Sequence, residues 1–440
     1  MVIYMRKFKA MLLIFTLMVS VAGCSKSYSN VPPQAVTPEV SDEDAIASQD
    51  NDGTEEKQLV PEEGAKLLIW EDSEAKVEYI KYVAEKFKET YGIEVEVSLV
   101  PDFSSRMIQD APSYLGPDLL EAPHDQSGTL LSAGLLQPND TTVDQIKKNF
   151  IKTVYDCLIY DDKVYGYPLT INTYALIYNK DIIGENGPET FQEIIDFAKD
   201  FNDPDENQYT IMWPINSPYY SHCILGGYGA YVFGKNGTDP SDIGLNTEAA
   251  IEGATYFKSL RSILNIKTAD ADGQVIDGLF VKGKLAYTIN GLWSVMNYEK
   301  QGINVGVAPL PKLENNEYPV TFLGVQTLYV SAYTKYPNAS KLFAEMATSE
   351  EMLKKRFELT REIPARTSLM DSDAVKADSI VAAFMLQAQR STPMPSIPQM
   401  NLVWNPYMSA LQSMWDIDTD PKEAMDTCAE TIKSFIEMQK

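Results

Sequence analysis

The order of apolar residues between positions 67 and 99 constrains the fold of this chain more than any other feature. The run LLIW at 67–70 predicts a short buried strand. Apolar residues at helical spacing then predict a helix that starts near Asp72 and stops at Gly92. At 93–99, apolar and polar residues alternate as in a half-buried strand. Strand, helix and strand within about 33 residues form a βαβ unit, which indicates a parallel sheet in an α/β fold.

The same alternation of strands and helices continues through the rest of the chain. The further strands are predicted at 118–122, 174–178, 284–289, 305–308 and 327–331, and the further helices at 190–201 and 339–348. The chain has 440 residues, whereas a typical domain has roughly 100–200. We therefore expect two packed lobes.

Residues 1–23 have the features of an export signal. A basic segment at 6–9 precedes the apolar run AMLLIFTLMVSV at 10–21. As a helix this run would measure ~18 Å, which is too short for a ~30 Å hydrocarbon core but typical of a signal peptide. The sequence VAGC at 21–24 resembles a bacterial lipobox, which implies a lipoprotein signal peptide and lipid (palmitate) on Cys24. The alternative is an ordinary signal peptide with an incidental cysteine.

Residues 24–66 are predicted to form a disordered acidic tether. From Ser25 to Lys66 the chain has ten acidic and three basic residues and few large apolar ones. Such a segment buries too little apolar surface to offset the entropy lost on ordering. Charge repulsion extends it, so we expect it to hold the folded part away from a membrane surface.

The formal net charge of −25 excludes several classes of partner. A chain this acidic disfavours nucleic acid and lacks the basic patch that binds anionic lipid surfaces. With only two histidines and four cysteines, we expect no cofactor and no metal. Beyond Cys24, we expect Cys157, Cys223 and Cys428 to be small buried residues. A bridge such as Cys157–Cys223 stays open as an alternative.

Two segments resemble known motifs but lack a residue that the chemistry needs. The segment 229–235 fits GxxxxGK, but Asn236 stands where a phosphate-binding loop needs Ser or Thr. The segment that begins at Asp270 resembles a calcium loop, but Val281 stands at its twelfth position instead of the closing Glu. We expect neither a nucleotide site nor a calcium site there.

Aromatic residues beside turns are the main candidates for a binding site. They occur at Trp213, Tyr219, Trp293 and Trp404. An aromatic ring can cover the apolar C–H face of a sugar, while Asp, Asn and Gln side chains bind its hydroxyls. For each of these residues, packing in the core is the alternative.

Motifs spread over about 67–436 resemble the solute-binding proteins of ABC sugar importers, in particular the maltose/maltodextrin-binding proteins. They include LIYNKD at 176–181, TINGLW at 288–293 and MPSIPQM at 394–400, which is followed by Trp404. The resemblance implies a periplasmic-binding-protein fold, in which two α/β lobes enclose a ligand cleft and hinge crossovers join them. The crossovers are expected near 169–172, 322–325 and 370–376, so that 67–170 and 324–372 form the N-terminal lobe and 171–323 and 373–440 the C-terminal lobe.

The resemblance also implies which residues bind the ligand. They are Glu74, Asp125, Gln126, Asn172, Ser217, Tyr219, Trp293, Met394 and Trp404. Trp293 and Trp404 match the two main stacking positions of the family. Asp125 matches a carboxylate that binds sugar hydroxyls. Gln126 stands in place of a basic residue and Asn172 in place of a Glu, so the charged recognition of hydroxyls differs from the family pattern and the sugar and its linkage stay open.

The function implied by the resemblance is that of a substrate-binding protein of an ABC transporter. It would be a monomer, anchored by lipid to the outer face of the cell membrane. It would capture an oligosaccharide, first of all maltose or maltodextrin (an α-glucan), and deliver it to the transmembrane subunits of a permease. No chemistry would occur on the sugar, so we expect no enzyme. The alternatives are a secreted glycan-active enzyme and a binding protein for a different oligosaccharide; a peptide carrier is disfavoured by the aromatic positions.

Overall fold

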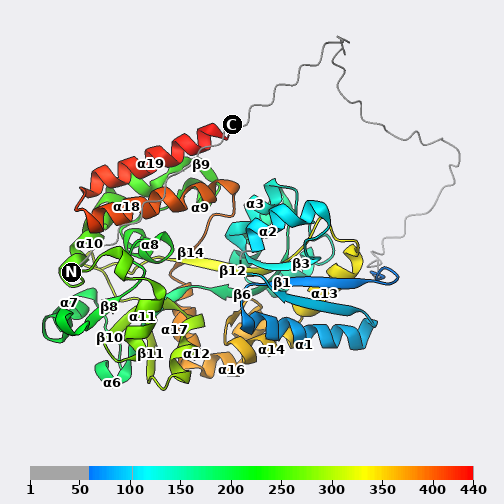
Figure 1. Ribbon diagram of the computed structural model, residues 1–440, viewed down its shortest axis with the longest axis horizontal. Coiled ribbons are helices and arrows are strands. Elements are labelled where there is room, and N and C mark those ends of the chain that lie inside the picture. Colours follow the sequence, from blue (N-terminus) through cyan, green and yellow to red (C-terminus); the bar gives the residue numbers. More distant parts are fainter. Residues whose placement is uncertain (1–58, 102, 440) are drawn as a thin grey trace, which may run out of the picture. The chain divides into compact units, whose positions relative to one another are not determined.

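The computed structural model describes residues 59–101 and 103–439. The predicted signal peptide, Cys24 and residues 25–58 of the predicted tether lie outside the described residues. The described chain forms one compact unit around two main β-sheets (Figure 1). None of the helices in this part of the chain is long and apolar enough to cross a lipid bilayer.

The larger sheet has seven strands in the order β13-β6-β12-β3-β1-β2, with β14 also paired to β12. Its strands are β1 (Lys66–Glu71), β2 (Glu94–Leu99), β3 (Leu119–Pro123), β6 (Tyr167–Asn172), β12 (Thr321–Val330), β13 (Ile363–Pro364) and β14 (Ser391–Pro393). β1 and β2 run parallel and are joined by α1 (Glu74–Tyr91). Gly92 ends α1 with a left-handed φ of 71°, and its N–H bonds to Lys88 O. The predicted βαβ unit is thus confirmed.

Side chains of β1 alternate between the two faces of the larger sheet. Leu67 and Ile69 join the core that includes α1, α13 (Pro337–Ala347) and α14 (Glu350–Thr360). Trp70 joins a second cluster, with α2 (Phe103–Asp110) and α3 (Ser127–Ser132), on the opposite face (Figure 1). Because both faces are covered, the strand is apolar on both sides, as the run LLIW predicts.

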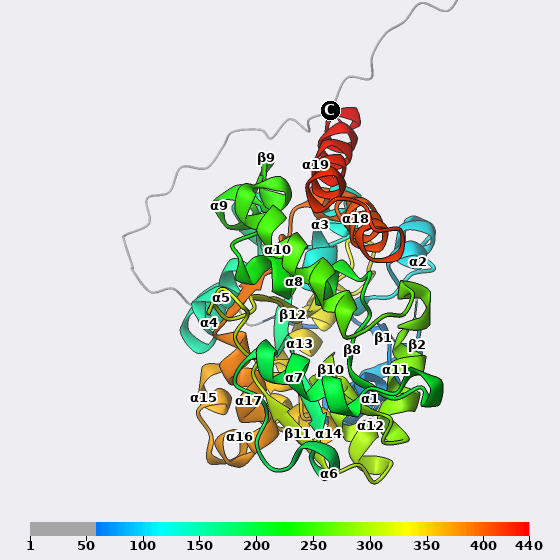
Figure 2. The same cartoon turned by 90° about the vertical axis from the view of Figure 1, so that its left-hand side faces the viewer.

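The smaller sheet has four strands in the order β11-β7-β10-β8. They are β7 (Tyr174–Asn179), β8 (Tyr209–Met212), β10 (Leu285–Gly291) and β11 (Val305–Ala308). The helices that contact this sheet are α7 (Phe191–Phe201), α11 (Gly273–Val281), α12 (Leu292–Lys300) and α17 (Ser379–Ala388). A further group packs together beside it: α8 (Pro218–Gly227), α10 (Glu248–Ser259), α18 (Trp404–Asp416) and α19 (Pro421–Met438) (Figures 1 and 2).

Short elements complete the described fold. They are η1 (Ala111–Ser113), η2 (His124–Gln126), α4 (Val143–Asn149), α5 (Lys152–Asp156), β4 (Ile159–Tyr160), β5 (Lys163–Val164), α6 (Lys180–Ile183), η3 (Pro204–Glu206), α9 (Gly234–Gly237), β9 (Asp239–Ile243), η4 (Gly244–Asn246), η5 (Leu260–Ser262), η6 (Thr268–Asp270), α15 (Thr367–Met370), α16 (Asp373–Ala377) and η7 (Pro398–Leu402). Every strand and helix predicted between 67 and 348 has a counterpart among the described elements.

Three segments carry the chain between the two sheets. The first joins β6 to β7 through Thr173, and the second is the start of β12. The third lies between α15, which contacts β13, and α17, which contacts β7 and β11. Near the first two, the Thr173 hydroxyl donates to Phe322 O at 2.9 Å and lies 2.9 Å from Thr321 Oγ1 and 3.2 Å from Ser391 Oγ. These buried hydroxyls tie the connecting segments together.

Three cysteines in the described chain are free and buried: Cys157, Cys223 and Cys428. The expectation of small buried residues is confirmed, and the alternative Cys157–Cys223 bridge is not formed. Burial raises the pKa of the Cys157 and Cys428 thiols to about 12. They therefore behave as apolar core side chains.

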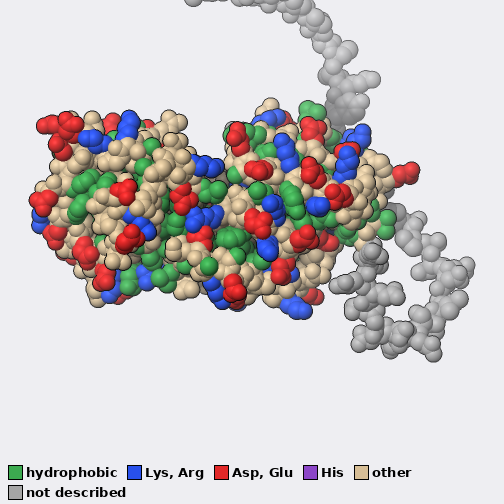
Figure 3. All heavy atoms as spheres, turned by 90° about the horizontal axis from the view of Figure 1, so that it is seen from below, with side chains coloured by type: hydrophobic (Ala, Val, Ile, Leu, Met, Phe, Trp, Pro, Cys, Tyr) green, Lys and Arg blue, Asp and Glu red, His purple; other side chains and the backbone are tan. Residues whose placement is uncertain are grey.

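Charged side chains of both signs are interspersed on the face drawn in Figure 3. Many of the acidic residues have a nearby lysine partner on the surface, as in the pairs Asp196–Lys199 at 2.6 Å and Asp426–Lys422 at 2.5 Å. Such exposed pairs each contribute only ~0.2–1 kcal/mol. The excess of acid thus does not form a single-sign patch on this face.

Residues 59–66 correct the predicted boundary of the tether, because they belong to the fold. Leu59 packs against the main core and Ala65 is buried. The Glu62 carboxylate accepts hydrogen bonds from the N–H groups of Asn338 at 2.8 Å and Ala339 at 3.1 Å, in the first turn of α13. That helix has no side-chain cap of its own, so a distant carboxylate takes this role. The composition of this segment gave no sign of the contact.

We expect Glu62→Ala to lower the free energy of unfolding by ~1 kcal/mol, because two helix N–H groups lose their acceptor. Thermal unfolding of the ligand-free protein measures the change. Glu63→Ala, in the exposed neighbour, is the matched control. A chain that starts at Lys66 should lose at least as much stability. If it melts at the same temperature as a chain that starts at residue 58, residues 59–65 do not contribute to the fold.

Candidate functional site

A cavity of about 740 Å³ is bordered by the larger sheet and the segments that follow its strands, and by the helices α8, α12 and α18. One wall is made of residues that follow the carboxyl ends of the parallel strands β1, β2 and β3: Asp72, Ser73, Lys76, Pro101, Pro123, Asp125 and Gln126. In open α/β sheets this edge is where ligands bind. The larger sheet itself adds Asn172, Gly324 and Gln326, and Glu362 lies just before β13.

The opposite wall is mainly aromatic. Tyr219 comes from the first turn of α8, Trp293 from α12 and Trp404 from the start of α18, and Met394 lies beside them. Trp293 is 45% exposed, which is unusual for the largest apolar side chain and favours a binding role over core packing. Trp213, another candidate from the sequence, is fully buried and is a core residue that pairs edge-on with Trp415.

The Trp293 ring requires the glycine two residues before it. A Cβ on Gly291 would lie only 2.1 Å from the ring, so the indole can rest here because Gly291 has no side chain. Phe322 braces the other two rings: its centroid lies 6.3 Å from Tyr219 and 6.1 Å from Trp404. Contacts within the protein therefore hold the aromatic wall in place.

Asp125 is the buried carboxylate of this cavity. It is 7% exposed, and its Oδ1 has no hydrogen-bond partner in the described structure. Burial raises the pKa of this carboxyl to about 6. An unpartnered buried acceptor costs ~1–3 kcal/mol, and a hydroxyl donor on a ligand would relieve that cost.

His124 fixes the backbone beside Asp125. Its Nδ1 accepts the N–H of Val325 at 3.0 Å, so its Nε2 carries the proton and donates to Met394 O at 2.9 Å. Burial lowers the pKa of this imidazole to about 4, which keeps it neutral. His124 therefore has a structural role, and it ties β12 to the segment that carries Met394.

Buried charges lie behind the polar wall. Arg356 donates to both carboxylate oxygens of Glu121 at 2.7 Å, and its Nε donates to Glu362 at 3.0 Å. Lys76 lies 3.3 Å from Glu121 and 3.0 Å from Asp72. Burial removes water from the charges of Arg356 and Glu121. Their bidentate ion pair offsets that cost. Of this group Lys76, Asp72 and Glu362 also line the cavity.

Seven of the nine ligand-binding residues predicted from the sequence line this cavity. They are Asp125, Gln126, Asn172, Tyr219, Trp293, Met394 and Trp404. Glu74 and Ser217 do not line it. Glu74 is exposed, because Lys76 faces the cavity and a residue two positions away points about 200° around the helix. Ser217 precedes α8 at its N-cap, and Tyr219 in the following turn forms the wall instead.

Sequence reasoning missed five polar residues of the cavity: Asp72, Ser73, Lys76, Gln326 and Glu362. Asp72 and Lys76 follow the carboxyl end of the first predicted strand, and the general rule for such sheets could have found them. Gln326 and Glu362 carry no comparable signal, because only the folded chain brings them to the cavity.

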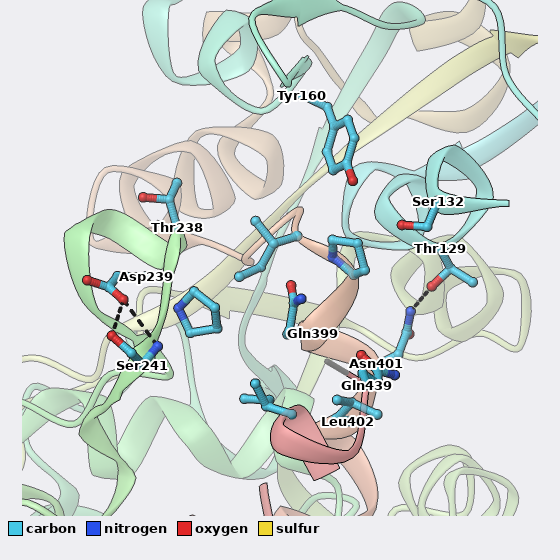
Figure 4. Close-up of a pocket in the computed structure, with 14 residues that line it drawn as sticks. Thr129, Ser132, Tyr160, Thr238, Asp239, Ser241, Gln399, Asn401, Leu402 and Gln439 are labelled. Atoms are coloured by element: carbon cyan, nitrogen blue, oxygen red, sulfur yellow. Dashed lines mark hydrogen bonds between the residues drawn. The ribbon is translucent and has the colours of Figure 1, made fainter. Parts of the chain in front are cut away.

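A second cavity, of about 870 Å³, lies beside η7 (Figure 4). It is lined by Thr129 and Ser132 of α3, by Asp239 and Ser241 of β9, and by residues of η7. Tyr160 points its hydroxyl into it (Figure 4). None of the predicted site residues lines this cavity.

Comparisons with known proteins agree with this geometry. A family model described as bacterial extracellular solute-binding protein matches residues 82–383. The galactooligosaccharide-binding protein of Bacillus subtilis (strain 168) is 34% identical over 385 residues, which cover 85% of this chain and 90% of that protein. The maltodextrin-binding protein MdxE of the same organism is 31% identical over 390 residues, which cover 84% of this chain and 91% of that protein.

Solved structures with similar folds contain maltooligosaccharides. A cyclo/maltodextrin-binding protein complexed with maltotetraose has a TM-score of 0.76 and 35% identity, over 85% of this chain and 98% of that chain. MalX from Streptococcus pneumoniae, in complex with maltopentaose, has a TM-score of 0.78 and 29% identity, over 84% of this chain and 100% of that chain. The predicted two-lobed α/β fold is confirmed.

We expect Asp125→Asn to raise the melting temperature of the ligand-free protein at pH 7.5. The folded pKa of about 6 lies above the unfolded value near ~3.9, so the folded state binds more protons in this window. Protonation of the Asp125 carboxyl therefore raises the free energy of unfolding as the pH falls from 6 toward 4. Loss of this proton lowers the free energy of unfolding as the pH rises. Asparagine avoids the cost of a buried charge, which is ~1–3 kcal/mol at pH 7.5.

Thermal unfolding between pH 4 and 7.5 measures the difference in stability between Asp125→Asn and the wild type, and we expect this difference to shrink toward pH 4. Asp200→Asn, at an exposed position of α7, controls for the change of net charge. Equal stability of Asp125→Asn and the wild type at pH 7.5 would contradict the raised pKa of the carboxyl.

Proposed function

Because this chain belongs to the family of bacterial extracellular solute-binding proteins, we propose that it captures an oligosaccharide in the cavity of about 740 Å³. The observation that carries this proposal is the difference between the two walls. Rings of Tyr219, Trp293 and Trp404 face a wall of hydroxyl-binding groups that includes the buried Asp125. A sugar has the matching surfaces, an apolar C–H face and a rim of hydroxyls.

Two sugar classes are candidates. Maltodextrin is the first, because MdxE binds maltodextrin by name and the similar structures hold maltotetraose and maltopentaose. Galactooligosaccharide is the second, because a relative of that name is 34% identical to this chain. Both are neutral and rich in hydroxyls, as the cavity requires.

The proposal includes movement of the lobes. Residues 67–170 with 324–372 would form one lobe and 171–323 with 373–440 the other. Since the polar wall belongs to the larger sheet and the aromatic wall to the elements around the smaller sheet, a sugar that touches both would favour closure around it. The segments tied by Thr173 would then be part of the hinge.

Delivery to a membrane permease completes the proposed function. Lipid on Cys24 would anchor the protein to the outer face of the cell membrane, and the acidic segment after it would provide reach. A relative in Streptococcus pneumoniae is named a maltooligosaccharide ABC transporter solute-binding lipoprotein, which supports this arrangement. The protein would act as a monomer and would pass the sugar to the transmembrane subunits of an ABC transporter.

The protein is proposed to bind the sugar without altering it. Glycoside hydrolysis needs one carboxyl as acid and a second as base or nucleophile. In this cavity, Asp72 and Glu362 are committed to ion pairs with Lys76 and Arg356. Among the buried carboxylates that line the cavity in the described structure, only Asp125 has an oxygen without a hydrogen-bond partner.

A sugar panel tests the proposed function. Thermal shift with maltose to maltoheptaose, cyclodextrins, and galacto-, cello-, xylo- and fructo-oligosaccharides should identify the ligand, since ligand at 100 times its Kd adds roughly 2.7 kcal/mol of stability. Incubation followed by chromatography should return the bound sugar intact. Turnover would support a glycan-active enzyme instead, and a shift with none of the sugars would overturn the proposal.

We expect Trp293→Ala and Trp404→Ala each to lose ~2–4 kcal/mol of binding free energy, because each indole covers a sugar face in a desolvated site. This corresponds to roughly 30- to 1000-fold in Kd, measured by calorimetry with the sugar that the panel identifies. The ligand-free melting temperature should change little.

Trp415→Ala is the control for a core residue. Its side chain is fully buried, so truncation should cost ~3–5 kcal/mol of stability. If Trp293→Ala and Trp404→Ala resemble Trp415→Ala, or if both retain wild-type affinity, the aromatic wall is not the binding surface.

A further inference from the structure

Gln326 is the only residue of strand β12 that is not buried. Its neighbours on both sides, Val325 and Thr327, are fully buried, whereas Gln326 reaches the cavity. The pairing of β12 with β6 shifts register at this point, between Gln326 opposite Thr170 and Thr327 opposite Pro168. Such irregularities often redirect a side chain beside a functional site.

Lys76 fixes the orientation of the Gln326 amide. Lys76 Nζ lies 3.3 Å from Gln326 Oε1. Because an ammonium group can only donate, the amide oxygen must face Lys76 and the amide nitrogen must face away from it. In the described structure, no side chain or backbone oxygen accepts a hydrogen bond from Gln326 Nε2.

Lys76 is itself held firmly. Its ammonium contacts Asp72 at 3.0 Å and Glu121 at 3.3 Å as well as Gln326, which accounts for all three of its protons. Burial alone would lower the pKa of Lys76, but the carboxylates of Glu121 and Asp72 outweigh burial and raise it. The lysine is thus a charged anchor with no proton left for a ligand.

We propose that Gln326 determines sugar specificity by donating a hydrogen bond from Nε2 to a hydroxyl oxygen of the bound oligosaccharide, while Lys76 acts as the positioning residue that orients the amide. This inference rests on the proposed function. Asp125, on the same cavity, accepts from another hydroxyl. A donor and an acceptor at separate points of one wall select for the arrangement of the hydroxyls, whereas the aromatic rings accept most sugar faces.

Gln326→Glu tests the donor directly. Glutamate has nearly the same size and keeps an oxygen for Lys76, but it replaces the amide nitrogen by an acceptor. We expect Kd for maltotetraose or β-1,4-galactotetraose, whichever binds the wild type, to rise roughly 5- to 100-fold, because a bound hydroxyl loses its donor. The ligand-free melting temperature should not fall, since the new carboxylate still pairs with Lys76.

Gln399→Glu is the matched control. It makes the same change of charge in a residue that lines the second cavity, and we expect its Kd to stay within 2-fold of the wild type. Unchanged affinity of Gln326→Glu, with a wild type that binds, would overturn this inference alone. A wild type that binds no sugar of the panel would overturn the proposed function and this inference together.

A double-mutant cycle separates positioning by Lys76 from direct contact. If Lys76 acts through the amide, Lys76→Met should weaken binding in the wild type and much less in a Gln326→Leu background. An equal loss in both backgrounds would show that Lys76 contacts the sugar itself, which overturns the positioning role. If Lys76→Met does not fold, because Glu121 loses a partner, the same cycle is run with Lys76→Arg, which keeps the positive charge but changes the contact with the amide oxygen.

Discussion

The bidentate pair between Arg356 and Glu121 is the interaction on which the polar half of the cavity depends. Both side chains are fully buried, and each would be costly there without the other. Glu121 also contacts Lys76, and Arg356 also holds Glu362. Two side chains that line the cavity, Lys76 and Glu362, are therefore held by one buried ion pair. Breaking it would leave a buried charge unpaired and would release the wall at the same time.

The two halves of the cavity have different origins in the chain. Carboxyl ends of parallel strands supply the polar wall, because β1, β2 and β3 all point toward one edge of the larger sheet. Starts of helices supply the aromatic wall, where Tyr219, Trp293 and Trp404 lie in first turns. Neither half encloses a ligand alone. A carrier built in this way can bind tightly when its lobes approach each other and release when they part.

Local patterns of the sequence predicted most of the fold, and long-range contacts account for what they missed. The βαβ unit at 67–99 is encoded by residues close in sequence, so periodicity finds it. Trp293 and Trp404 were found through the motifs beside them, whereas Trp213, which also precedes a turn, is a core residue. Glu62 looked like part of an acidic tether, but it caps α13 some 276 residues away. Gln326 and Lys76 are 250 residues apart in sequence but form a hydrogen bond, and no local sequence pattern predicts this contact.

Two residues of the cavity lower the stability of the fold but suit the binding of a ligand. Asp125 keeps an oxygen without a partner, and Trp293 exposes much of its indole. Folding stability would favour an asparagine in place of Asp125 and a smaller side chain in place of Trp293. Their presence is consistent with a site whose unsatisfied groups are completed by the ligand, since natural proteins trade stability for function at such places. Rigid anchors such as Lys76 limit this cost, because the groups that bind need not be ordered again when the sugar arrives.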